Sequence, residues 1–176
     1  MNPRAAGVAL IAVSVALSPA CARKEGEAAF RPLAVGQAIG AYVVETLAGD
    51  TVRLGGPGRM TVVNIWATWC TSCREEMADF NALDREFGPR GVVVLAVSVD
   101  ADNGARVRRF VEEEKLGFTI GCDPERRVEQ VFQVVGVPET FVIGRDGRLV
   151  WRHIGNVHAV IDSLRAVIGG AVGASS

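Results

Sequence analysis

The sequence carries no excess of charge of either sign and is poor in cysteine. Its 19 lysines and arginines nearly balance its 20 aspartates and glutamates. This balance gives no support for nucleic-acid binding, because proteins that bind nucleic acid usually present a basic face. Four cysteines in 176 residues are too few for a fold held together by a disulfide scaffold. Internal repeats and low-complexity runs are also absent.

Recognisable zinc and phosphate motifs are missing as well. Cys70 and Cys73 form a close pair, but a structural zinc site needs four ligands. The other candidate ligands do not form a second close pair: Cys122, His153 and His158. The glycine-rich stretch 55–58 lacks the following Lys-Ser/Thr of a phosphate-binding loop, so we assign no phosphate site there.

The chain does contain enough apolar residues, 49% of the total, for one domain with a sizeable core. Apolar and β-branched runs predict strands, and spacing near 3.6 residues predicts helices. Strands that alternate with helices and end in a hairpin predict an α/β fold, with a mixed central sheet, helices on both faces and an added N-terminal β-hairpin. The expected strands and hairpins are 42–54, 60–66, 92–99, 118–120 and 140–154. The expected helices are 71–87, 102–115, 124–135 and 157–168.

Residues 1–22 have the composition of a secretory targeting segment. Arg4 is its only charged residue, residues 8–17 form an apolar run, and small residues follow up to Cys21. That order matches the basic, apolar and cleavage regions of a signal peptide. The uncharged part also approaches the length that spans a bilayer.

Three fates of this segment stay open. Signal peptidase could cut after Ala20 or Ala22, Cys21 could be lipidated, or the segment could be retained as a membrane anchor. Lipoprotein signals usually carry leucine three residues before the cysteine, and here Ser18 holds that position. Each fate predicts a domain outside the cytoplasm, either free in the periplasm or attached to a membrane.

The rest of the chain divides by composition into three parts. Residues 23–38 mix charges with Gly and Ala and show no period, so we expect a tether. Residues 39–170 form the expected domain, and residues 171–176 the expected flexible tail.

The central motif is Cys70-Thr71-Ser72-Cys73, which follows an apolar strand and opens a helix. A C-x-x-C at such a junction is typical of a thioredoxin-like redox site. Cys70 would lie at the helix N-terminus, where the helix dipole favours a thiolate. Cys73 would lie one turn inside, close enough to form a disulfide and release it, so the pair could pass two electrons to a partner's disulfide. A purely structural disulfide or half of a zinc site are the alternatives.

The motifs W-A-T-W-C-x-x-C-R-x-E and G-V-P-E-T-F together resemble the TlpA/ResA/DsbE group of thioredoxin-like thiol–disulfide oxidoreductases, over residues 43–168. The nearest similarity is to the DsbE (CcmG) type. It implies a bacterial, extracytoplasmic reductant of protein disulfides in cytochrome c maturation. The partners would be apocytochrome c and a membrane thiol–electron donor, and the reaction would need no cofactor or metal. Thr71-Ser72 departs from the group, where proline is common between the cysteines. Ala67 replaces the Thr of the peroxiredoxin T-x-x-C, which argues against peroxide reduction.

The resemblance also implies roles for residues outside the cysteine pair. Trp69 would form an exposed platform beside the nucleophile. Val137 and Pro138 match the cis-proline loop, whose backbone would pair with an extended substrate; X–Pro bonds tolerate the cis form far better than others do. Glu139 is either an acidic group near the active site or a surface glutamate, and both interpretations stay open.

We predict that Glu76 is a buried acid–base group. On a helical wheel it lies within the apolar stripe formed by Met77, Phe80, Leu83 and Phe87. Asp84 shares that stripe, but Glu76 is one turn from Cys73. Thioredoxins carry a buried Asp six residues before the first cysteine, where this chain has Asn64. Burial should raise the pKa of Glu76 and couple its titration to that of Cys73. The alternative is an exposed helix glutamate.

Two other functions stay open at this point. One is a general TlpA/ResA-like reductase with another target, such as the cysteine pair of an oxidase copper site. The other is a non-catalytic metal carrier in which Cys70 and Cys73 act as soft ligands. We expect Cys122 to be a buried, inert thiol, and His153 and His158 to be structural or solvated.

Overall fold

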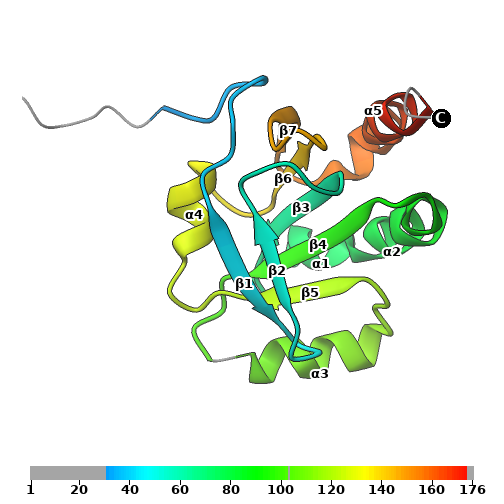
Figure 1. Cartoon of the computed structure of the whole chain (residues 1–176). Coiled ribbons are helices and arrows are strands. Elements are labelled where there is room, and N and C mark those ends of the chain that lie inside the picture. The colour runs from blue at the N-terminus through cyan, green and yellow to red at the C-terminus, as the bar shows by residue number, and fades with distance from the viewer. Residues whose placement is uncertain (1–30, 103, 174–176) are drawn as a thin grey trace, which may run out of the picture.

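The fold is built on one seven-stranded mixed sheet with the strand order β2-β1-β5-β4-β3-β6-β7 (Figure 1). The computed structural model describes residues 31–102 and 104–173. Strands β3, β4 and β5 run parallel to one another, and all other neighbours are antiparallel. The strands are β1 (Tyr42–Thr46), β2 (Thr51–Leu54), β3 (Thr61–Trp66), β4 (Val93–Ser98), β5 (Thr119–Cys122), β6 (Glu139–Ile143) and β7 (Leu149–Ile154).

The predicted mixed sheet and N-terminal hairpin are confirmed. The hairpin β1–β2 extends the sheet, because β1 pairs with β5 through Glu45 and Thr46. Every residue of β3 is buried, including the polar Thr61 and Asn64, so this strand is covered on both faces.

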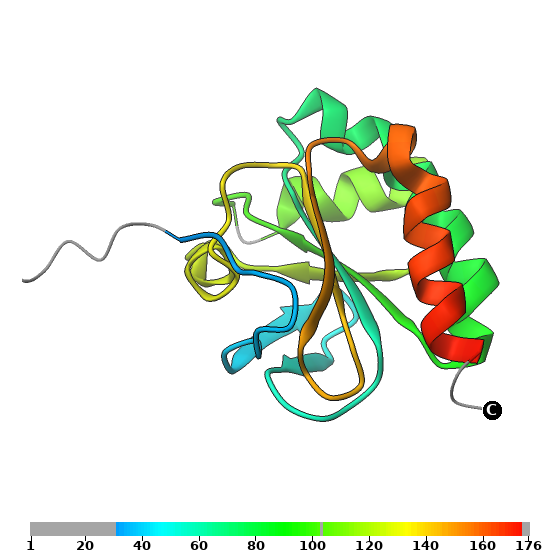
Figure 2. The ribbon, with the colours of Figure 1, turned by 90° about the horizontal axis from the view of Figure 1, so that it is seen from above.

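Helices cover both faces of the sheet. Figure 2 shows α4 on the opposite side of the sheet from α2 and α5. Phe132 of α4 packs on Phe141 of β6, with ring centroids 5.0 Å apart, while Phe110 of α3 packs on Trp66 of β3 at 5.4 Å. The helical segments are α1 (Thr71–Glu75), α2 (Met77–Phe87), η1 (Gly88–Arg90), α3 (Ala105–Glu114), α4 (Arg127–Phe132), η2 (Val157–Val160) and α5 (Ile161–Gly173).

All four predicted helices differ from the structure at their N-terminal parts. Helix α3 begins at Ala105 rather than at residue 102, and residues 157–160 form the 3-10 segment η2 before α5. The helix predicted over 71–87 is interrupted at Glu76, where α1 ends and α2 begins. The helix predicted from residue 124 begins only at Arg127. Its N-cap is Arg126, and Asp123 and Pro124, where a cap and a first helical residue are predicted, lie before the helix. The Asp123 carboxylate still accepts a hydrogen bond from the Val128 N–H at 2.7 Å.

The two ends of the domain extend beyond the predicted limits. Helix α5 continues through two glycines to Gly173, and burial of Val172 stabilises this last turn, so residues 171–173 are not a flexible tail. At the other end, the Gly36 N–H donates to the Leu149 carbonyl at 2.7 Å, and the Leu149 N–H donates to Gln37 at 2.8 Å. The last residues of the predicted tether are therefore part of the fold.

The predictions for residues 1–22, including Cys21, lie outside the described residues, as do those for 23–30. Within 31–102 and 104–173, no helix combines the length and apolarity that a membrane crossing requires.

Candidate active site

Cys70 and Cys73 are joined by a disulfide at the junction of β3 and α1. Cys70 is the N-cap of α1, and its Sγ accepts a hydrogen bond from the Cys73 N–H at 3.2 Å. Cys70 is 8% exposed, whereas Cys73 is completely buried. A partner molecule can therefore reach only the sulfur of Cys70, and the backbone N–H beside that sulfur favours its thiolate form.

Asp100 holds the loop that leads into the cysteine pair. Its two carboxylate oxygens accept hydrogen bonds from the Thr68 N–H at 2.8 Å and the Thr68 hydroxyl at 2.6 Å. The Ser98 hydroxyl donates to the same carboxylate at 2.7 Å. This contact was missed at the sequence level, although a signal existed. Asp100 lies two residues after the end of β4, which is parallel to β3, so the residues that follow both strands lie at one edge of the sheet.

Trp69, between this loop and the disulfide, is 59% exposed. Its exposure agrees with the predicted platform. A role in binding a partner remains a prediction.

The loop between α4 and β6 faces the disulfide. The Val137–Pro138 peptide bond is cis, as predicted. The Val137 carbonyl oxygen lies 3.8 Å from the Cys70 Sγ, so the backbone of this loop borders the accessible sulfur.

Glu139 directly follows the cis-proline loop and is completely buried, so its interpretation as a surface glutamate is wrong. It forms an ion pair with Arg152 and accepts a hydrogen bond from the Val135 N–H at 2.8 Å. The Arg152 guanidinium also lies over the Phe141 ring, 5.5 Å from its centroid. The Glu139 carboxylate thus ties the cis-proline loop to β7.

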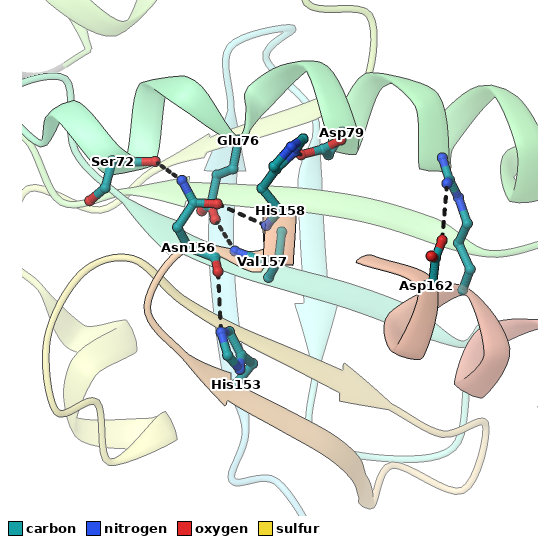
Figure 3. Close-up of polar contacts among 9 residues, drawn as sticks. Ser72, Glu76, Asp79, His153, Asn156, Val157, His158 and Asp162 are labelled. Carbon is teal, nitrogen blue, oxygen red and sulfur yellow. Dashed lines mark hydrogen bonds and ion pairs between the residues drawn. The ribbon is translucent and has the colours of Figure 1, made fainter. Parts of the chain in front are cut away.

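Glu76, at the break between α1 and α2, is completely buried, as the helical wheel predicts. One carboxylate oxygen accepts a hydrogen bond from the Asn64 side-chain amide at 2.8 Å. The other accepts one from the Val157 N–H at 2.8 Å (Figure 3). Asn64 also donates to the Thr140 hydroxyl at 3.1 Å, so the carboxyl group is connected to both β3 and β6.

Burial raises the pKa of the Glu76 carboxyl from 4.5 to about 7. The hydrogen bonds from Val157 and Asn64 oppose this rise, and the nearby Asp79 carboxylate adds to it. A carboxyl group with a pKa near neutrality can accept or donate a proton close to physiological pH. The sequence places it one helical turn after Cys73.

The segment between β7 and η2 borders the site on the α1 side. Asn156 donates from its side-chain amide to the Ser72 carbonyl at 3.0 Å (Figure 3). His158 lies on the surface and contacts Asp79, and His153 contacts the Asn156 carbonyl, so both histidines are structural or solvated as expected. Asn156 was missed at the sequence level because no spacing or motif marks it.

Cys122 lies away from this arrangement, at the end of β5. It is a free thiol that is half-buried, not fully buried as predicted, and this partial burial raises its pKa, which makes a thiolate less available. Among the described residues, no group of three His, Cys, Asp or Glu side chains is placed to hold a metal ion.

A mixed sheet, a disulfide with one slightly exposed and one buried cysteine after a central strand, and a facing cis-proline loop together define a thioredoxin-like redox protein. The model of the AhpC/TSA family matches residues 35–152. The thiol–disulfide oxidoreductase ResA of Bacillus cereus is 30% identical over 122 residues, which cover 69% of this chain and 70% of that protein. ResA of Geobacillus kaustophilus is 33% identical over 118 residues, covering 66% and 67%.

Solved structures agree. A Chlorobium tepidum protein provisionally named thiol:disulfide interchange protein DsbE is 27% identical, with a TM-score of 0.73, over 80% of this chain and 99% of that one. StoA from Bacillus subtilis, at 21% identity and a TM-score of 0.63 over 72% and 95% of the two chains, shares the fold. The chain belongs to the AhpC/TSA family and, within it, is a thiol–disulfide oxidoreductase of the ResA/DsbE type.

Proposed function

We propose that this oxidoreductase reduces disulfides of partner proteins on the extracytoplasmic side of a membrane, in the maturation of c-type cytochromes. The observation that carries the proposed exchange chemistry is the asymmetry of the site. One sulfur is accessible at a helix N-terminus, and the other is buried one turn before a carboxyl group whose pKa is about 7. Such a pair suits attack on a partner followed by internal resolution.

In the first step the Cys70 thiolate attacks one sulfur of the partner disulfide. A new bond forms between Cys70 and that sulfur, and the second partner sulfur leaves as a thiolate. In the second step the Cys73 thiolate attacks the Cys70 sulfur and releases the first partner sulfur. The partner gains two electrons and two protons, and the enzyme is left with the Cys70–Cys73 disulfide present in this structure.

Glu76 accepts and returns the proton that Cys73 loses in the second step. Cys73 is buried, so water cannot easily remove its proton. In the reduced enzyme the Glu76 carboxylate would accept the Cys73 proton as Cys73 attacks, and the protonated carboxyl would then return a proton towards the departing thiolate. A pKa near 7 suits both directions of transfer.

The partner docks on the apolar surface around Cys70. Among the described residues, exposed large apolar side chains are few. Three of them lie next to the cysteine pair or the cis-proline loop: Trp69 at 59%, Val135 at 55% and Ile154 at 54% exposure. Ile154 of β7 pairs in the sheet with Glu139 of β6, the residue that follows Pro138. An extended segment of a disulfide-bearing polypeptide could lie against the Val137–Pro138 backbone, with its apolar side chains on this surface.

The cytochrome c assignment rests on the G-V-P-E-T-F and Trp151-Arg152-His153 stretches, which are nearest the DsbE type, and on the similarity to the Chlorobium tepidum structure. The proposed extracytoplasmic location and the proposed attachment to the membrane both rest on the composition of residues 1–22. Since that compartment is oxidising, a membrane thiol–electron donor must reduce the Cys70–Cys73 disulfide after each cycle.

Trapping the partner tests this function. A Cys73→Ser variant cannot resolve the mixed disulfide, so we expect it to accumulate apocytochrome c bound to Cys70 in cells. Cys122→Ser is the matched control and should trap nothing. A deletion strain should lose c-type cytochromes, and added reductant should restore them. Normal cytochrome c together with a defect in oxidase copper loading would instead favour a general ResA-like reductase.

A further inference from the structure

Three consecutive residues after β7 contact several parts of the active site. The Gly155 N–H donates to the Pro138 carbonyl at 2.9 Å. The Asn156 side-chain amide donates to the Ser72 carbonyl at 3.0 Å. Val157 donates from its backbone to the buried carboxylate described above. We call these three residues the strap, because they join the cis-proline loop to the turn that carries both cysteines.

The Asn156 side chain is held in one orientation. Its Oδ1 accepts a hydrogen bond from the His158 N–H at 2.8 Å, which caps η2. This contact directs the other half of the amide, Nδ2, towards the Ser72 carbonyl (Figure 3). The backbone before it turns at Gly155, whose φ of 96° lies in the left-handed region that favours glycine.

Ser72 lies between the two cysteines, and its position matters most when the disulfide is open. In the oxidised enzyme, the Cys70–Cys73 bond itself closes the turn. After reduction that constraint is gone, and Cys73 can approach Cys70 only if the turn keeps its shape. A hydrogen bond that holds the middle of the turn reduces the conformational freedom that must be lost before the sulfurs react.

We propose that Asn156 is a positioning residue for thiol–disulfide exchange. By holding Ser72 in the reduced enzyme, it keeps the Cys73 sulfur within reach of the Cys70 sulfur during resolution. It contacts neither sulfur and takes no part in the transfer of electrons or protons. The attack itself is the one described above: Cys73 bonds to Cys70, and the partner sulfur leaves as a thiolate.

An Asn156→Ser variant separates this contact from the cap of η2. Serine is a good helix-capping residue, so the acceptor for the His158 N–H is retained, but its shorter hydroxyl cannot span the distance to Ser72. In stopped-flow measurements on the mixed disulfide between Cys70 and glutathione, we expect the rate at which Cys73 displaces glutathione to fall about two- to tenfold, the factor that corresponds to the free energy of one hydrogen bond.

The mixed disulfide between Cys70 and glutathione should accumulate in Asn156→Ser, because Cys73 resolves it more slowly. The matched control is His158→Ala, which removes the surface contact with Asp79 and leaves the side chain of Asn156 in place. We expect the control to match the wild type. An unchanged rate of resolution in Asn156→Ser, or an equal fall in the control, would overturn the proposal.

A measurement on the wild type covers the case in which Asn156→Ser does not fold. The side-chain amide hydrogens of Asn156 should exchange slowly with solvent in NMR spectra of both the oxidised and the reduced protein. Loss of this protection on reduction would show that the bond to Ser72 does not persist in the dithiol form, and the proposal would then be wrong.

Discussion

Replacing Glu76 by Gln should remove a pH-dependent component of stability. The pKa of this carboxyl is about 7 in the folded protein, against 4.5 for the free side chain. Between these two values the folded protein binds more protons than the unfolded chain. Stability from this group is therefore complete below pH 4.5 and is lost as the pH rises through about 7. The difference in pKa corresponds to about 3 kcal/mol.

In Glu76→Gln, the uncharged glutamine amide should form hydrogen bonds in place of the carboxylate. Asn64 Oδ1 is buried and has no hydrogen-bond partner in the described structure, while its Nδ2 contacts Glu76. If the Asn64 amide turns over, its oxygen can accept a hydrogen bond from the new amide. Because Gln does not titrate, the variant lacks the pH dependence of the wild-type carboxyl.

The assay is urea unfolding of the oxidised protein, followed by tryptophan fluorescence at several values between pH 4.5 and pH 8. The free energy of unfolding of Glu76→Gln, minus that of the wild type, should rise by about 3 kcal/mol across this range. Taking the difference cancels the titration of groups that both proteins share. Glu75→Gln, at an exposed position, should show no such change.

A difference that stays constant with pH would refute the raised pKa. The proton-transfer role needs a second measurement, the rate at which Cys73 resolves a mixed disulfide as a function of pH. We expect the variant to resolve more slowly and to lose the inflection near pH 7. Identical pH–rate profiles for the two proteins would refute that role even if the stability result holds.

Three further predictions concern other parts of the chain. Alkylation of the reduced protein at low reagent concentration should label Cys70 well before Cys73, and mass spectrometry of the peptides would show the reverse if the division of labour is wrong. Cys21→Ala should release the protein from membrane fractions if that cysteine is lipidated, whereas unchanged retention would favour an uncleaved anchor. Glu139→Gln should lower the free energy of unfolding by about 3 kcal/mol, because it leaves the largely buried side chain of Arg152, 11% exposed, without its counter-charge; a loss below about 1 kcal/mol in urea unfolding would contradict this.

Much of the fold could be predicted from the sequence, because apolar residues form continuous runs in its strands and repeat at helical spacing in its helices. The buried run of β3 and the pair of cysteines after it placed the redox site. The burial of Glu76 followed from its place on the apolar stripe, since a helix repeats every 3.6 residues. The break at Glu76 was not predictable, because neither proline nor glycine marks it.

The contacts that hold the site together were harder to predict. Asn156 and Arg152 lie more than 75 positions beyond the cysteine pair in a chain of 176 residues. Each is a single polar residue within or after a strand, so no repeating pattern indicates its partner. Their partners depend on which strands are neighbours. Only the observed order, with β6 between β3 and β7, brings Arg152 to Glu139 and Asn156 to Ser72.

The first described residues of the chain are connected by hydrogen bonds to the strand that supports the cis-proline loop. Arg152, which neutralises Glu139, also donates to the Leu33 carbonyl at 3.4 Å, and Arg148 donates to the Gly36 carbonyl at 2.8 Å. A force applied to the chain before Leu33 would therefore be borne by β7 and by the guanidinium that supports the cis-proline loop. The orientation of the accessible sulfur is thus set relative to the point where the chain enters the domain.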